Sequence, residues 1–156
     1  MATQIQVSTR REFRVKADPK QAYALLADVP GSASHYPKVK ALRDLGDGAY
    51  RWEMQEIGLS GFSHQVVYAC RYEEDEAGGT VRWTPVNGEG NSEISGSWRL
   101  EPEGGGTRLT LEVRGDLSVP VPWLLRSIAG PFVEREFKQQ IDTYVRNLTR
   151  ALGGDS

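Results

Sequence analysis

The chain has 156 residues and a net charge of −2 at neutral pH, with 38% apolar and 26% charged residues. This length and composition are typical of a globular protein with a hydrophobic core, and we expect one domain over residues 1–156. The near-neutral charge provides no basic surface for nucleic acid or an anionic membrane, so neither is expected as a partner.

Cysteine content and the N-terminal sequence set further limits. Cys70 is the single cysteine, so an intramolecular disulfide and a thiolate metal cluster are both excluded. Residues 1–13 lack the apolar core of a signal peptide, and no apolar run approaches the roughly 20 residues that span a bilayer. We therefore expect a cytoplasmic protein without a transmembrane segment. The sequence indicates no oligomeric state.

The N-terminal part is expected to contain one strand and two short helices. Apolar alternation predicts the strand over 5–16. Asp18 and Pro19 indicate a helix start, because aspartate caps free N–H groups and proline suits the first helical turn. We expect this helix to be broken at Pro30-Gly31 and a second short helix or turn to follow over 31–37.

The middle of the chain is expected to be a meander of strands. Alternation and turn-forming glycines predict six of them, over 38–45, 49–57, 62–74, 80–86, 92–101 and 107–119. Residues 87–91 are expected to form one of the loops. With the first strand, these make a seven-stranded antiparallel sheet.

The last segment, about 121–152, is expected to form a long helix, because apolar residues recur at three-, four- or five-residue spacing. Pro131 either kinks this helix or starts its main part after a short lead-in. Gly153-Gly154 ends it. A single helix across a curved sheet often leaves a hollow, which suggests a bound apolar ligand.

Four segments resemble one known superfamily: ADPKQAYALLADV at 17–29, HYP at 35–37, GSWRLEPEGGGTRLTLEV at 96–113 and LLRSIAGPFVEREFKQQI at 124–141. They are similar to the START and Bet v 1-like (SRPBCC) superfamily, and most to its polyketide cyclase/dehydrase and coenzyme Q-binding branch. The resemblance implies an α+β helix-grip fold, in which a curved seven-stranded antiparallel sheet, two short helices and a long C-terminal helix enclose a cavity. Members include polyketide aromatase/cyclases, lipid and quinone carriers and plant hormone receptors.

Strand parity predicts which side chains face the hollow, and the resulting inner face is rich in aromatic residues. Each tryptophan on it either lines a ligand pocket or fills the core. Both faces of the strand over 62–74 carry apolar residues, so its orientation stays open. The superfamily places the stretch around Tyr36 at the cavity mouth. The expected ligand-binding residues are Tyr36, Trp52, Met54, His64, Tyr68, Trp83, Trp98 and Phe132.

Three residues are candidates for catalysis. His64 can act as a general acid or base, since its ordinary pKa is near 6.5, or it is an inward histidine satisfied by a neighbour. Tyr68 can donate a hydrogen bond. Arg71 can orient a ligand carbonyl or enolate, as the resemblance to aromatase/cyclases suggests. Parity puts Arg71 opposite His64, so a solvated outer face is the alternative for Arg71.

No cofactor or metal is expected. The two histidines and one cysteine do not form a recognisable ligand set, and no nucleophile motif or phosphate loop is present. The favoured function is therefore binding of a hydrophobic small molecule, such as a lipid, quinone or polycyclic aromatic or polyketide compound. The alternatives are a polyketide aromatase/cyclase, acting by substrate orientation and acid–base catalysis, and a protein-interaction module.

Overall fold

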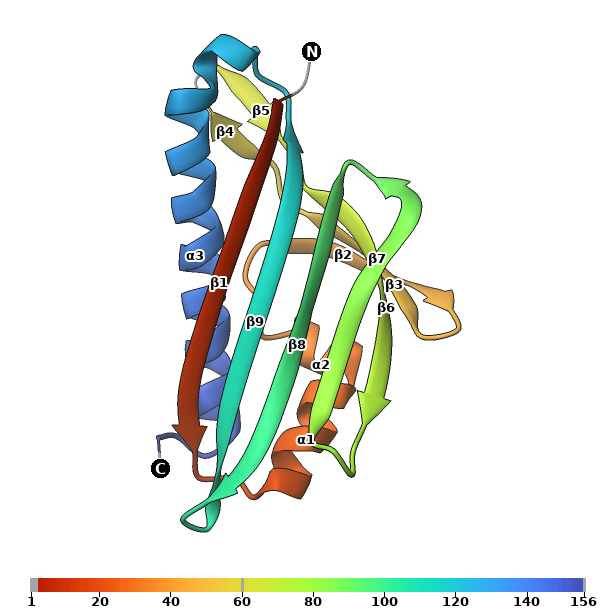
Figure 1. The fold of residues 1–156 in the computed structure, drawn as a ribbon, viewed down its shortest axis with the longest axis vertical. Coiled ribbons are helices and arrows are strands. Elements are labelled where there is room, and N and C mark those ends of the chain that lie inside the picture. Colours follow the sequence, from red (N-terminus) through yellow and green to blue (C-terminus); the bar gives the residue numbers. More distant parts are fainter. Residues whose placement is uncertain (1–2, 60, 156) are drawn as a thin grey trace.

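An antiparallel, curved sheet is the centre of the computed structural model, which describes residues 3–59 and 61–155. Its seven strands follow the order β1-β9-β8-β7-β6-β3-β2 (Figure 1). They are β1 (Thr3–Val15), β2 (Val39–Gly46), β3 (Ala49–Met54), β6 (Val67–Asp75), β7 (Thr80–Gly90), β8 (Ser92–Glu103) and β9 (Gly106–Val119). The short strands β4 (Ile57–Leu59) and β5 (Phe62–His64) pair with each other as a separate hairpin.

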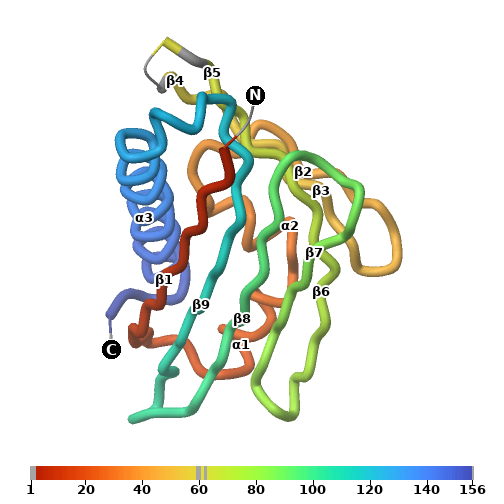
Figure 2. Tube along the Cα trace, turned by 45° about the horizontal axis from the view of Figure 1, so that its top comes forward, coloured from red at the N-terminus to blue at the C-terminus, as the bar shows by residue number. Residues whose placement is uncertain are grey.

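The helices cover the inner side of this sheet (Figure 2). They are α1 (Pro19–Ala27), α2 (Val29–Ala33) and the long α3 (Arg126–Ala151), with a 3-10 turn at Trp123–Leu125 before α3. Figure 1 shows α3 alongside β1, with α1 and α2 near the opposite end of α3 from the β4–β5 hairpin. The expected α+β helix-grip fold is thus confirmed. None of the helices in the described part of the chain has the length and apolar character needed to cross a membrane.

The start of α1 follows from its sequence. The Asp18 carboxylate accepts a hydrogen bond from the Gln21 backbone N–H at 2.8 Å, and the Gln21 side chain accepts one from the Asp18 N–H at 3.4 Å. The expected break at Pro30-Gly31 is wrong, since both residues lie inside α2. The break comes at Asp28, whose carboxylate caps α2 through the Gly31 N–H at 3.3 Å.

The strands expected over 49–57 and 62–74 are each interrupted. β3 ends at Met54 and β6 begins only at Val67, because the chain between them turns away as the β4–β5 hairpin. The base of this excursion is closed by two hydrogen bonds: the Met54 N–H donates to the Val66 carbonyl at 3.0 Å, and the Gln65 side-chain amide donates to the Met54 carbonyl at 2.9 Å. Residues 65 and 66 are therefore not part of a strand.

Two further differences concern chain segments near glycine and proline. The loop expected over 87–91 is largely strand, because β7 continues to Gly90. Gly90 has a φ of +76°, and a Cβ there would lie 2.1 Å from the Val67 carbonyl oxygen, so only glycine fits. Near the C-terminus, α3 runs through Pro131, so the alternative that this proline starts the main helix is wrong. The helix ends before Gly153, as expected.

The core lies between the inner face of the sheet and the helices. Its fully buried side chains come from sheet and helix alike: Val15, Val81, Trp98, Leu109 and Leu111 from strands, and Ile141 and Leu148 from α3. The C-terminus is tied to the end of β1, since the Ala17 N–H donates to the Leu152 carbonyl at 2.9 Å. These contacts fix α3 across the sheet and so define the space left between them.

Candidate functional site

An internal pocket with a cavity volume of about 100 Å³ lies between the sheet and α3. Its walls come from strands β3 to β9, from α1 and the segment containing α2, and from one face of α3. All eight expected ligand-binding residues line it: Tyr36, Trp52, Met54, His64, Tyr68, Trp83, Trp98 and Phe132. Their contact with a ligand stays a prediction.

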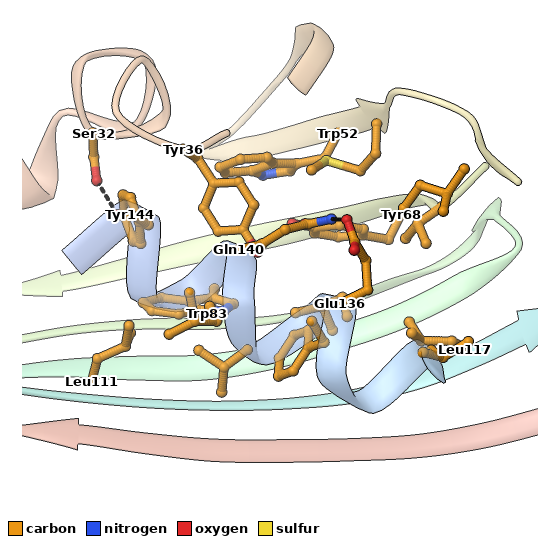
Figure 3. A pocket seen from close by; sticks show the side chains of 18 of the residues that line it. Ser32, Tyr36, Trp52, Tyr68, Trp83, Leu111, Leu117, Glu136, Gln140 and Tyr144 are labelled. Carbon is orange, nitrogen blue, oxygen red and sulfur yellow. Dashed lines mark hydrogen bonds between the residues drawn. The ribbon is translucent and has the colours of Figure 1, made fainter. Parts of the chain in front are cut away.

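One wall of the pocket is a set of aromatic rings in mutual contact (Figure 3). The Tyr36 ring lies 5.8 Å from Trp52, edge to face, and 5.0 Å from Tyr144. Trp52 stacks on Tyr68 at a centroid distance of 5.8 Å and an interplanar angle of 11°. Its indole N–H donates to the Tyr72 hydroxyl at 3.0 Å, so its polar atom is satisfied within the wall.

Trp83 and Trp98 form a second aromatic region. Trp98 is fully buried and packs edge-on against Phe13, with ring centroids 5.9 Å apart. Trp83 lies against Gly96, where a Cβ would come within 2.5 Å of the indole ring. Gly96 therefore leaves room for the Trp83 side chain on the pocket side of the sheet. The indole rings act both as core and as pocket lining.

His64 reaches the pocket from β5 and is only 5% exposed. Its Nε2 atom is buried and has no hydrogen-bond partner among the described residues. Burial lowers the pKa of the imidazole, because it disfavours the charged form. A neutral imidazole with an unpaired ring nitrogen can accept or donate one hydrogen bond, so His64 has the capacity to contact a ligand.

Tyr68 lines the same pocket, and burial raises the pKa of its phenol well above the ordinary value. The Tyr68 hydroxyl therefore stays protonated and can donate a hydrogen bond. Burial likewise raises the pKa of Tyr144 to about 12, and the Tyr144 hydroxyl is paired with the Ser32 hydroxyl. His64 on β5 and Tyr68 on β6 therefore line one cavity, although they belong to separate strands with residues 65 and 66 between them.

Arg71 does not belong to the pocket. Its side chain is exposed on the other face of β6, where its Nε donates to the Asp47 carbonyl at 3.4 Å. Alternate residues Tyr68 and Tyr72 point inward instead. The carbonyl-orienting role suggested for Arg71 is therefore contradicted by its position.

Cys70 lies between Tyr68 and Tyr72 on β6 and is fully buried. Burial raises the pKa of its thiol to about 12, so Cys70 is unsuited to act as a nucleophile.

Sequence reasoning missed a polar row on α3. Glu136, Gln140 and Tyr144 follow one another at four-residue spacing, which places them on one face of the helix, and all three line the pocket. The Glu136 carboxylate accepts hydrogen bonds from the Lys38 ammonium and, at 3.3 Å, from the Gln140 amide. Burial raises the pKa of Glu136, but these two donors outweigh burial and lower it overall.

Solved structures share this fold at low sequence identity. A protein from Thermus thermophilus superposes with a TM-score of 0.70 at 21% identity, over 94% of this chain and 96% of that one. The Zhui aromatase/cyclase from Streptomyces gives a TM-score of 0.68 at 13% identity, over 94% and 93%. A START superfamily protein from Mycobacterium smegmatis gives 0.60 at 17% identity, over 94% and 96%. At these identities the likeness shows the fold alone.

Comparison at the sequence level gives the family. No curated protein sequence matches the chain. The family described as polyketide cyclase / dehydrase and lipid transport matches residues 6–152, which is nearly the whole chain. With this match, the chain belongs to the polyketide cyclase/dehydrase and lipid transport family.

Proposed function

We propose that this protein binds a hydrophobic small molecule, such as a lipid, quinone or polycyclic aromatic or polyketide compound, in the pocket between the sheet and α3. The observation that carries the proposal is an aromatic-walled internal cavity lined by His64, whose buried Nε2 atom has no hydrogen-bond partner among the described residues. Burying apolar ligand surface against these walls contributes about 25 cal/mol for each Å². The single-domain organisation and cytoplasmic location expected from the sequence form part of the same proposal.

The size of the cavity sets a condition on binding. About 100 Å³ is well below the roughly 300–1,000 Å³ of pockets that hold drug-sized ligands. A polycyclic ligand must therefore enlarge the pocket by moving side chains or a chain segment. In our proposal the segment 32–36 moves away from α3, because its contacts with that helix include two polar pairs, Ser32 with Tyr144 and the His35 carbonyl with Asn147. The packing of the Tyr36 ring against Tyr144 would rearrange in the same movement.

Native mass spectrometry of the freshly purified full chain tests the proposal. We expect a non-covalent adduct that disappears on denaturation, and solvent extraction followed by mass analysis then gives its chemical class. A protein that is free of adduct, and whose thermal unfolding midpoint is unchanged by quinones, fatty alcohols and polycyclic aromatics, would refute a binding function.

A second candidate function is polyketide aromatisation and cyclisation, favoured by the joint presence of His64 and Tyr68 in one pocket. In this reaction neutral His64 would take a proton from a carbon between two ketones of a bound poly-β-ketone. The resulting enolate carbon would attack a second carbonyl carbon of the same chain. That carbonyl oxygen would take up the proton, with the Tyr68 hydroxyl hydrogen-bonded to it.

Cyclisation kinetics with a poly-β-ketone substrate test this second function. Loss of the base or of the hydrogen-bond donor, in His64→Leu and Tyr68→Phe, is expected to lower kcat by roughly 10²-fold or more. Arg71→Ala is the matched control, because the Arg71 side chain lies outside the pocket on the same strand as Tyr68. Equal rates in all three variants and the parent would refute catalysis by these groups.

A further inference from the structure

The charges around the pocket are unevenly distributed. Among the described residues that line it, Glu136 is the only one with an ionised side chain, and this side chain is 18% exposed. Figure 3 shows the Glu136 and Gln140 side chains reaching from α3 toward Tyr68. The nearby cation, Lys38, is already bound to Glu136, and Arg71 points away from the cavity. A ligand anion would therefore lie near the Glu136 carboxylate, and no described residue that lines the pocket offers a cation to pair with it.

The remaining polar groups of the wall are neutral. His64 is kept uncharged by burial, and the phenols of Tyr36 and Tyr68 are kept protonated because burial raises the pKa of both. A neutral imidazole and a phenol hydroxyl hydrogen-bond well to a hydroxyl or a carbonyl oxygen. A carboxylate, in contrast, would leave water for this cavity without an ion pair, and burial of an unpaired charge is strongly unfavourable.

We infer that the pocket selects uncharged ligands bearing a hydroxyl or carbonyl group, which His64 contacts, and that Glu136 excludes carboxylates and phosphates. This inference rests on the proposed binding function and narrows it: neutral quinones, sterol-like alcohols, phenols and polyketide ketones are ligands, whereas free fatty acids and phosphorylated lipids are not.

Three probes of nearly equal size test the inference by isothermal titration calorimetry of the full chain at pH 7.5: 2-naphthol, 2-naphthoate and naphthalene. We expect 2-naphthol to bind at least about tenfold more tightly than 2-naphthoate. The free-energy cost of burying one unpaired carboxylate exceeds the 1.4 kcal/mol that corresponds to a tenfold difference in affinity. Naphthalene should bind more weakly than 2-naphthol, because it offers His64 no polar partner.

A pair of variants on α3 isolates the role of the carboxylate. Glu136→Gln removes the negative charge and frees the Lys38 ammonium, so we expect the affinity for 2-naphthoate to rise at least about tenfold relative to 2-naphthol. Glu134→Gln is the matched control, because Glu134 is exposed, lies outside the pocket and pairs with Lys138 at 3.0 Å. In this control the ratio of the two affinities should equal that of the parent.

The outcomes separate the inference from the function beneath it. Binding of 2-naphthoate as tight as that of 2-naphthol would overturn the inference while leaving a binding function in place. An affinity ratio that Glu136→Gln does not change would likewise overturn the role of Glu136. If none of the three probes binds and no ligand co-purifies, the proposed binding function is refuted and this inference with it.

Discussion

A substitution that fills the pocket should weaken ligand binding without lowering the stability of the fold. Val113 lies on β9, is 6% exposed and lines the cavity. In Val113→Phe the larger ring can occupy the vacant volume. An empty apolar cavity destabilises a protein by about 24 cal/mol for each Å³. A cavity of about 100 Å³ thus corresponds to roughly 2.4 kcal/mol, which is the upper limit of what complete filling recovers. We expect the free energy of unfolding of Val113→Phe to equal that of the parent or to exceed it by up to about 2 kcal/mol.

Val119→Phe is the matched control for this prediction. Val119 lies on the same strand and is fully buried, but it does not line the pocket. The same substitution there overpacks a filled region, which typically lowers the free energy of unfolding by about 1–3 kcal/mol. Urea denaturation measures both variants, and calorimetry with 2-naphthol measures their binding.

The two variants should then affect binding and stability separately. Val113→Phe should bind 2-naphthol at least about tenfold more weakly than the parent, while Val119→Phe retains binding at temperatures where it is folded. The reasoning would be refuted by a Val113→Phe protein as destabilised as Val119→Phe, or by one that keeps the parent's affinity, since either result would mean that no usable cavity exists beside Val113.

Three further predictions concern single contacts. Because burial lowers the folded-state pKa of His64, the unfolded chain takes up the proton first as the pH is lowered, so the free energy of unfolding falls as pH decreases through about 6.5. In His64→Leu the free energy of unfolding should lack this loss, and an identical pH dependence in both proteins would contradict the prediction. Ser32→Ala and Tyr144→Phe each leave one buried hydroxyl unpaired and should each cost about 1–3 kcal/mol, whereas their combination should cost less than the sum by at least ~0.5 kcal/mol; strict additivity in urea titrations would disprove the coupling. Gly96→Ala places a methyl group 2.5 Å from the Trp83 ring, so we expect destabilisation of about 1–3 kcal/mol and a shifted Trp83 indole signal in NMR spectra, and an unmoved signal would argue against this contact.

The tryptophan-rich wall shows what strand alternation can predict. Side chains two residues apart face the same side of a strand, so the inward orientation of Trp52, Trp83 and Trp98 follows from parity once the strands are placed. Parity also puts Arg71 opposite Tyr68, as observed, but it could not decide which of the two faces is inside. Packing of β6 against the rest of the sheet decides that.

The β4–β5 hairpin shows where sequence reasoning failed. A long strand and two short strands joined by a turn have similar apolar alternation, so 49–57 and 62–74 were expected to be continuous. The hydrogen bonds that close the hairpin at Met54 involve residues eleven and twelve positions away, at Gln65 and Val66. Local propensity carries little information about such a closure, although the glycines at 58 and 61 mark the region as one able to turn.

The sequence by itself determined the local features of this protein: the Asp18 cap, the glycine turns, the alternation of the strands and the apolar stripe of α3, because each depends on neighbours within a few residues. The resemblance of its segments to a known superfamily supplied the overall fold. Tertiary structure alone decided the cavity volume, the isolation of His64 Nε2 and the pairing of Lys38 with Glu136, two residues 98 positions apart. These properties depend on how helix and sheet pack across the whole chain, and packing at that range leaves no periodic signal in the sequence.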